Sequence, residues 1–193
     1  MSQSTPNIAV ITPFGFGNSG LCLLKNKYSN CIYKMNSLNI SEPRIEHRDE
    51  QHFVAIQMDL IREKIPELLP PLIPELFKWL EKNRVEPSGP PFFSYVKMEG
   101  KQMRVKVGIL TDSNVSSDES VEVGSFPEGN YMVATYKGDY SNLYNVHSRL
   151  EEWRVKNGIR LSGPLTEFYP SDPAIETNPD KWITIITNQI MED

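Results

Sequence analysis

The spacing of apolar residues between positions 44 and 115 predicts a strand, a helix and two further strands. Residues 44–58 supply the first strand, and its apolar part lies at 53–56. Two later runs of alternating or continuous apolar residues indicate a hairpin, with strands at 92–96 and 104–107.

The helix of this half is indicated by Leu76, Trp79 and Leu80, which share one face at i, i+3 and i+4. Proline is tolerated only in the first turn of a helix, so this helix is predicted to begin at Pro71 or Pro74 and to end at Asn83. The proline-rich residues 87–91 are expected to form a turn.

Residues 128–190 predict the same order of elements. A strand at 131–136 is followed by a helix that Asp139 or Ser141 caps and that reaches Asn157. Strands at 165–169 and 182–187 follow, separated by a loop at 171–181. The polar, acidic residues 114–127 are expected to connect the two halves without regular structure.

The two halves also share sequence. Residues 76–95 and 150–169 align without gaps at a shift of 74 residues. Because tryptophan is rare, a matched tryptophan followed by a matched Ser-Gly-Pro indicates a duplicated module. The identical pairs are Leu76/Leu150, Trp79/Trp153, Lys82/Lys156, Asn83/Asn157, Ser88/Ser162, Gly89/Gly163, Pro90/Pro164 and Tyr95/Tyr169.

A duplicated β-α-β-β module predicts an α+β fold. We expect one mostly antiparallel sheet with two main helices on one face and a ligand groove between the modules. Module one is assigned to residues 44–115 and module two to residues 128–190, within a domain of residues 42–193 that follows an N-terminal extension of residues 1–41. Trp79 and Trp153 are expected to anchor the helices, each contributing about 3 kcal/mol.

The N-terminal extension contains a match to the dinucleotide-binding pattern GxGxxG at Gly15, Gly17 and Gly20. That site needs a long helix and then a strand ending in an acid about 20 residues further on. Here Asn and Ser occupy the position of the acid, so a glycine-rich turn in an appended arm is the competing interpretation.

Composition narrows the function further. A net charge of −5 and a pI near 5.3 argue against a nucleic-acid surface. The start lacks the basic segment of a signal peptide, and no apolar run is long enough to cross a membrane, so we expect a cytoplasmic protein without direct nucleic-acid or membrane binding. Cys22 and Cys31 are then expected to stay reduced, and we expect no metal and no cofactor.

Several strings in module two, in this order and spacing, resemble the GyrI-like family, also called the bacterial transcription activator effector-binding domain. The likeness covers residues 44–190. It implies a duplicated β-α-β-β fold that binds hydrophobic, often cationic, small molecules between its modules. It is carried by residues 132–140 (MVATYKGDY), Leu150 and Trp153, Ser162-Gly-Pro164, Glu167-Phe-Tyr169, Asp172-Pro173 and Trp182.

One position departs from the family pattern. Similar sequences carry Trp-x-x-Glu at the start of the last strand, and the resemblance implies that this glutamate faces a cationic ligand. Here the run is Trp182-Ile-Thr-Ile185, so the groove gains apolar surface and loses an anion. Lys106 matches Ile185 in the other module and is expected to be solvated.

Residues of the two central strands are the first candidates for ligand binding. Alternation places Phe93 with Tyr95, and Glu167 with Tyr169, on the same faces of their strands. The residues leave open whether these faces line the groove or pack against the helices. Glu167 is the candidate for a catalytic acid or for the missing charge, or else an exposed or ion-paired edge residue.

The remaining candidates flank a strand-to-helix turn or open the last strand. The resemblance implies that Tyr136, Tyr140, Trp182 and Ile185 lie near the ligand, although Tyr136 and Tyr140 also fit a surface turn. His147 lies on the inward stripe of its helix, where a core histidine is commoner than a base.

Three functional hypotheses follow. The first is a stand-alone protein that holds hydrophobic or aromatic, drug- or toxin-like ligands without catalysis. The second is a hydrolase of strained, cyclopropane-type toxins that uses Glu167 and a tyrosine. The third is a protein-interaction module similar to a gyrase inhibitor, with a protein partner. The first is favoured because no nucleophile motif, metal cluster or DNA-binding module is recognisable.

Overall fold

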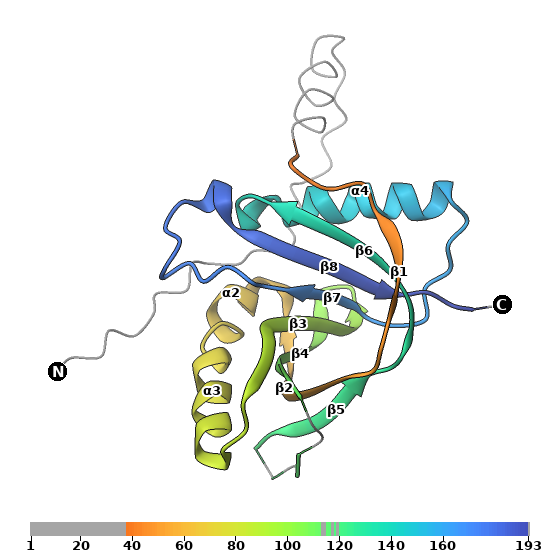
Figure 1. Cartoon of the computed structure of the whole chain (residues 1–193). Helices are drawn as coiled ribbons and strands as arrows, with labels where there is room; N and C mark the ends of the chain where they lie inside the picture. Colours follow the sequence, from red (N-terminus) through yellow and green to blue (C-terminus); the bar gives the residue numbers. More distant parts are fainter. Residues whose placement is uncertain (1–37, 113–114, 117, 119, 193) are drawn as a thin grey trace.

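The computed structural model describes residues 38–112, 115, 116, 118 and 120–192. The GxGxxG match and both cysteines lie outside the described residues. A single curled sheet runs through this region, with helices packed against it (Figure 1). The fold is therefore α+β, as the sequence predicts.

The elements follow one another in two similar series. The first is β1 (Arg44–Arg48), β2 (Gln51–Ile61), a 3-10 turn (Arg62–Lys64), α2 (Ile65–Leu68), α3 (Leu72–Asn83), β3 (Pro87–Glu99) and β4 (Gln102–Thr111). The second is β5 (Glu122–Phe126), β6 (Gly129–Lys137), a 3-10 turn (Tyr140–Asn142), α4 (Leu143–Lys156), β7 (Leu165–Phe168), a 3-10 turn (Pro179–Lys181) and β8 (Ile183–Gln189).

The eight strands have the order β1-β6-β8-β7-β3-β4-β2-β5, and every pair in this sheet is antiparallel. Each module contributes three neighbouring strands, and β3 and β7 join the modules at the centre. The predicted duplication therefore corresponds to a pseudo-twofold arrangement around the β3–β7 pair.

The outer strands correct the predicted boundaries. Residues 44–58 form two strands instead of one. The strand is interrupted at Asp49 and Glu50, and β1 and β2 pair with different partners. Part of the predicted connector is also a strand, since β5 pairs with β2 just as β1 pairs with β6. Each module thus sends a leading strand to the edge of the other, a long-range pairing that local sequence cannot encode.

The proline-rich segment is a second correction. Pro87 to Pro91 begin β3 instead of forming a separate turn, and the register with β4 shifts between Pro87 and Pro91. Prolines lack the N–H that a continuous ladder needs, so they are accommodated at an irregularity of this kind.

The main core lies between the helices and one face of the sheet. Leu76 and Leu80 of α3, and Val146 and Leu150 of α4, are buried in one cluster with residues from both modules. Of the two matched tryptophans, Trp79 is buried and donates a hydrogen bond to Asp118, as expected for an anchor. Trp153 is only half-buried, so its contribution is smaller than the sequence suggests.

A smaller aromatic cluster covers the opposite face of the sheet. Phe53, Phe92, Phe126 and Phe168 contact one another there, with ring centroids 4.9–5.7 Å apart. The two faces of the sheet therefore differ, because all residues of this cluster lie on strands whereas the main core also includes helix residues.

The sheet register identifies the centre of the pseudo-twofold. Phe93 of β3 faces Glu167 of β7 directly, and these two residues occupy equivalent positions in the two modules. Equivalent residues can face each other only where the pseudo-twofold axis passes between their strands. The two equivalent residues beside this axis therefore differ: module one has an aromatic ring there, and module two has a carboxylate.

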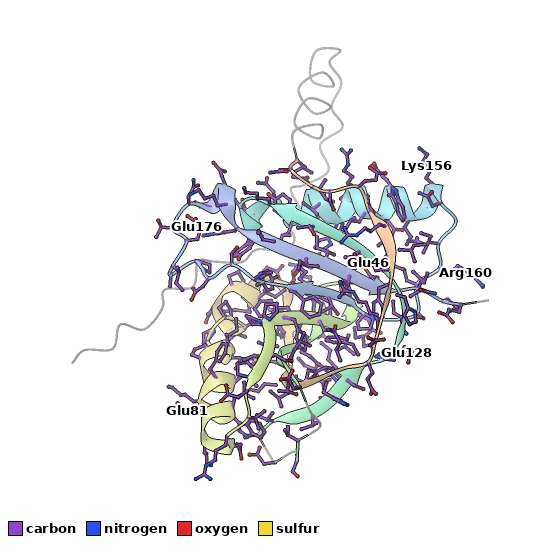
Figure 2. The ribbon with its side chains drawn as sticks, viewed as in Figure 1. Glu46, Glu81, Glu128, Lys156, Arg160 and Glu176 are labelled. Carbon is purple, nitrogen blue, oxygen red and sulfur yellow. The ribbon has the colours of Figure 1, made fainter. Side chains whose placement is uncertain are left out.

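Glu81 on α3 and Lys156 at the end of α4 lie at the periphery of the molecule (Figure 2). None of the described helices has the length and apolar character needed to cross a membrane.

Candidate functional site

The carboxylate of Glu167 is completely buried and holds three side chains together. The hydroxyls of Tyr95 and Tyr169 each donate a hydrogen bond to its Oε2, both at 2.7 Å. His147 Nε2 lies 2.7 Å from the other oxygen, Oε1. These four residues are called the carboxylate cluster below.

Burial alone would raise the pKa of the Glu167 carboxyl. The hydrogen bond and charge of His147, together with the two phenol donors, outweigh burial and lower that pKa below its usual range. Burial first, and the Glu167 charge second, raise the pKa of both Tyr95 and Tyr169 well above normal. The two phenols therefore remain donors, and the carboxylate remains their acceptor.

Three elements position this cluster. The equivalent residues Tyr95 and Tyr169 lie two positions beyond the Phe93–Glu167 pair on their strands, so alternation directs both phenols to the helix side. His147 belongs to α4, one residue after the buried Val146. Duplication thus explains why two tyrosines converge on one carboxylate.

Further aromatic rings extend from Tyr169. The centroid of its ring lies 5.2 Å from that of Phe93 and 5.3 Å from that of Tyr140, and both ring pairs are nearly edge to face. Tyr140 lies 4.6 Å from Trp182, whose indole nitrogen donates to the carbonyl of Glu176. Ring pairs of this kind stabilise one another and form a rigid wall.

An apolar cavity of about 280 Å³ opens in front of this wall. Tyr140, Tyr169 and residues 170–173 from module two form one side, and α3 and the start of β3 from module one form the other. We call it the proline cavity, because five of its lining residues are prolines. It is lined by Ile73, Pro74, Phe77, Pro90, Pro91, Tyr140, Tyr169, Pro170, Ser171, Asp172 and Pro173.

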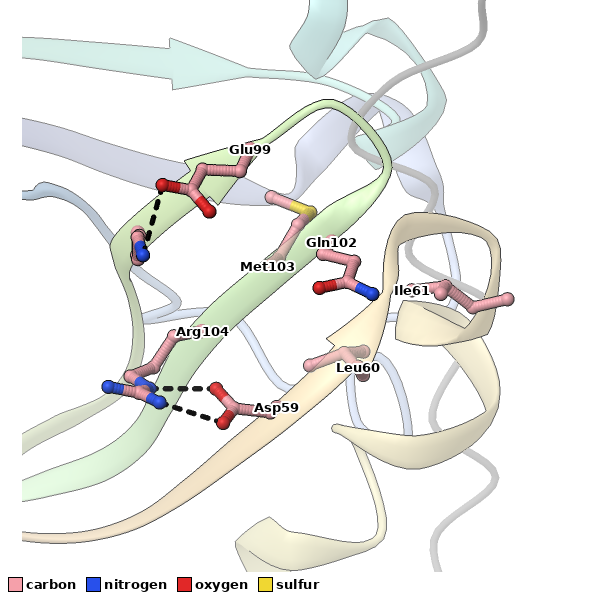
Figure 3. A pocket seen from close by; sticks show the side chains of 8 residues that line it. Asp59, Leu60, Ile61, Glu99, Gln102, Met103 and Arg104 are labelled. Carbon is pink, nitrogen blue, oxygen red and sulfur yellow. Dashed lines mark hydrogen bonds and ion pairs between the residues drawn. The ribbon is translucent and has the colours of Figure 1, made fainter.

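A hollow at the other end of module one has a different character. It lies along β2, β3 and β4, and its charged residues are already paired with one another (Figure 3). Arg104 binds Asp59 through two nitrogens, and Lys97 lies 3.0 Å from Glu99. Such exposed pairs belong to a solvated surface.

The structure brings together some of the predicted site residues. Tyr140 and Tyr169 line the proline cavity, and Glu167 and Tyr95 lie behind it in the carboxylate cluster. Phe93 is completely buried and does not line the cavity. Trp182 is buried too and supports Tyr140 from behind.

Two predicted residues lie elsewhere. Ile185 packs with the phenylalanines on the opposite face, because in the register of β8 it is Ile186 that faces the helices. Tyr136 lines a separate surface hollow beside Lys137 and Asp139. Lys106, the counterpart of Ile185, is only 20% exposed in its side chain and pairs with Glu122, so it is not simply solvated.

Sequence reasoning missed the contributions of α3 and His147. Ile73 and Phe77 are four residues apart and therefore share a helix face, and Phe77 remains 42% exposed. His147 is largely buried and hydrogen-bonded, as the inward stripe of its helix predicts, but its partner Glu167 lies 20 positions away and cannot be identified from the sequence. An exposed phenylalanine on an otherwise amphipathic helix was the available signal.

Among the described residues, no group of three or more His, Cys, Asp or Glu side chains has the arrangement of a metal site.

Comparison with known proteins gives a consistent picture. A family model described as a GyrI-like small molecule binding domain matches residues 41–189, which include both modules. No curated protein matches the chain at a significant level.

Solved structures with the same fold have low sequence identity. EcmrR in a complex with DNA has a TM-score of 0.70 at 18% identity, covering 87% of this chain, and this chain spans 63% of that one. The isolated EcmrR C-terminal domain has a TM-score of 0.68 at 16% identity, with 79% of this chain and 98% of that domain covered.

Two further structures carry a ligand or an activity in their description. SAV2435 bound to tetraphenylphosphonium has a TM-score of 0.55 at 14% identity, covering 78% of this chain and 94% of that one. A hydrolase from Listeria innocua has a TM-score of 0.50 at 15% identity, and the match covers 84% of this chain and 98% of that one. At these identities the likeness establishes the fold.

Proposed function

Because this chain belongs to the GyrI-like small-molecule-binding family, we propose that it binds hydrophobic aromatic molecules in the proline cavity between its two modules. The observation that carries the proposal is the cavity itself, which is apolar and lies against the Tyr140–Tyr169 wall. Ligand sites are commonly concave, mostly apolar and furnished with a few polar groups.

The size of the cavity limits the ligand. At about 280 Å³ it lies near the lower end of the range for organic ligands, and it suits one or two fused rings rather than a large drug. The backbone has no N–H donor at Pro90, Pro91, Pro170 and Pro173, so it can form few hydrogen bonds with a strongly polar ligand. A flat ligand whose ring system is hydrocarbon is therefore the best match.

The charges near the cavity favour a positively charged ligand over a neutral one. Asp172 lies on its rim, and Glu167 lies behind Tyr169. Burial, and after it the negative charges of Asp172 and Glu167, raise the pKa of Tyr140, so its hydroxyl stays protonated. Aromatic faces attract cations as well.

Calorimetric titration with two matched probes tests the proposal. 1-Naphthylmethylammonium and 1-naphthalenemethanol share a ring system and differ in charge. We expect both to bind, the cation more tightly, with a favourable contribution of about 0.5–2 kcal/mol from its charge. The experiment uses the full chain, at low and at moderate salt.

A pair of surface variants provides the control. Phe77→Ala and Val155→Ala each remove a partly exposed apolar side chain from a helix, but only Phe77 lines the proline cavity. Phe77→Ala and Tyr169→Ala should weaken binding at least tenfold, whereas Val155→Ala should leave it unchanged. Equal affinities in Phe77→Ala and Val155→Ala would contradict the proposed site.

A hydrolase is the second candidate function, and the carboxylate cluster is the observation that favours it. Two phenols, an imidazole and a carboxylate within hydrogen-bonding distance can polarise a bound electrophile. The lowered pKa of Glu167 makes it a poor general acid, so it would act as a base or as a negative charge. Turnover of a cyclopropane-containing alkylating agent that is lost in Glu167→Gln would support this role, and equal rates would remove it.

A further inference from the structure

A second cavity lies on the opposite side of the carboxylate cluster from the proline cavity. Its volume is about 760 Å³, and it opens between the end of β3, the helix α4 and the residues that precede β7. Tyr95 and His147, two members of the cluster, form part of its wall. The second cavity therefore borders the carboxylate cluster through Tyr95 and His147.

The two cavities are counterparts under the pseudo-twofold axis. At the shift of 74 residues that relates the modules, Tyr95 corresponds to Tyr169, and both line their respective cavities. The helix positions correspond in the same way. Ile73, Pro74 and Phe77 of α3 line the first cavity, and their equivalents His147, Ser148 and Glu151 of α4 line the second.

The chemistry of the two walls has diverged. The three helix residues are apolar in module one, whereas in module two they are an imidazole, a hydroxyl and a carboxylate. The second cavity also has a larger share of polar surface and nearly three times the volume. A planar apolar ligand suits the first cavity, and a ligand with hydrogen-bonding groups suits the second.

The side chain of Asn188 indicates which chemical group of a ligand would bind in the second cavity. This residue lines the cavity, is only 6% exposed and forms no side-chain hydrogen bond with the described residues; its amide is not among their fully inaccessible polar atoms, so it is open to the cavity. Its equivalent in module one, by the pairing of β4 and β8 with their neighbours, is the completely buried Ile109. A polar residue has therefore replaced a core residue here.

An amide that is open to a cavity is hydrated there, and a ligand that displaces this water must supply matching hydrogen bonds. The side chain of Asn188 offers both donors and an acceptor. A carboxamide carries the complementary pair and can bind through two hydrogen bonds. Apolar side chains around it, including Met98 and Met132, suit an attached hydrocarbon group.

The charged residues at this cavity argue for an uncharged ligand. Lys97 is paired with Glu99, and Glu151 is paired with Arg154, so neither charge calls for a counter-ion. His147 is engaged with Glu167. We propose that the second cavity is a distinct binding site for small amphipathic amides, with the carboxamide held by Asn188.

Nuclear magnetic resonance of the 15N-labelled full chain tests this proposal. N-Acetyl-leucinamide is the probe, and N-acetyl-leucine methyl ester, which lacks the terminal amide, is the matched control. We expect saturable shifts of the Asn188 side-chain NH2 resonances with an affinity in the millimolar range, as suits a small ligand, and much weaker binding of the ester.

Asn188→Ile gives module two the residue of module one and should weaken amide binding at least tenfold, while 1-naphthylmethylammonium still binds in the proline cavity. Should Asn188→Ile fold poorly, Met98→Glu is the alternative, because Met98 is 47% exposed and a charge there disturbs only the apolar wall. The proposal would be overturned if the Asn188 resonances did not respond to the amide, or if amide and ester bound equally. Either result would show that water, and not a ligand, forms the hydrogen bonds of this side chain.

Discussion

Replacing the acceptor at the centre of the carboxylate cluster is the most direct test of what holds the two modules together. Glu167→Leu keeps a similar volume but removes the oxygen that both Tyr95 and Tyr169 use. Both tyrosines are nearly inaccessible, at 2% and 6% exposed, so water cannot easily replace the lost partner. The variant therefore leaves two buried hydroxyls without an acceptor and also removes the Glu167 contact of His147.

The magnitude follows from these contacts. An unsatisfied buried hydroxyl costs about 1–3 kcal/mol, so two cost roughly 2–6 kcal/mol. Removing a buried carboxylate returns part of its own desolvation penalty. A net loss of about 3 kcal/mol in the free energy of unfolding is the expected result for Glu167→Leu. Glu167→Gln keeps one acceptor oxygen for both phenols and should lose only about 1 kcal/mol.

Adding Tyr95→Phe and Tyr169→Phe to Glu167→Leu separates lost hydrogen bonds from altered packing. This triple variant has neither the two phenol donors nor their acceptor. It lacks the His147 contact just as Glu167→Leu does, so the two proteins differ only in the phenols. Replacing both partners of a hydrogen bond by apolar groups of similar shape is close to neutral. Its stability should therefore recover by about 2 kcal/mol relative to Glu167→Leu alone. Urea unfolding followed by tryptophan fluorescence measures all four proteins, provided that the slopes agree.

The reasoning would be refuted by two results together. If Glu167→Leu lost less than about 1 kcal/mol, and the two Tyr→Phe changes made it less stable still, the phenols would not depend on Glu167. The cluster would then be an ordinary part of the core.

Two further predictions concern acid stability and a turn. The pKa of Glu167 is lowered on folding, so its ionised form contributes stability that is present above its unfolded pKa of about 4.3 and lost as the pH falls through the folded value. Acid titration of the unfolding free energy should therefore fall more steeply below about pH 4 in the wild type than in Glu167→Gln, and parallel curves would argue against the lowered pKa. Gly138→Ala should cost about 2–3 kcal/mol, because its φ is 152° and a Cβ atom would lie 2.3 Å from the hydroxyl of Tyr136. Gly100→Ala, at a φ of 60° with nothing within 4 Å, is the matched control and should cost only about 1 kcal/mol in thermal unfolding.

The sequence by itself determined the architecture of each module. Matched Trp, Ser-Gly-Pro and Tyr residues revealed the duplication, and apolar periodicity located α3 and α4 to within one or two residues. These features are local, since helix faces and strand alternation are set by neighbours a few positions away. The same locality explains the errors at β1, β5 and the proline-rich start of β3, where distant partners decide the pairing.

Only the tertiary structure decided which candidate residues meet. Alternation places Glu167 and Tyr169 on one face of β7, but the β3–β7 register is what brings Tyr95 and Phe93 to them, and the packing of α4 is what adds His147. The register likewise turned Ile185 to the opposite face and left the amide of Asn188 in a cavity. A shift of one residue in a strand pairing exchanges the two faces, and that choice depends on the summed burial of the whole sheet, which no short stretch of sequence contains.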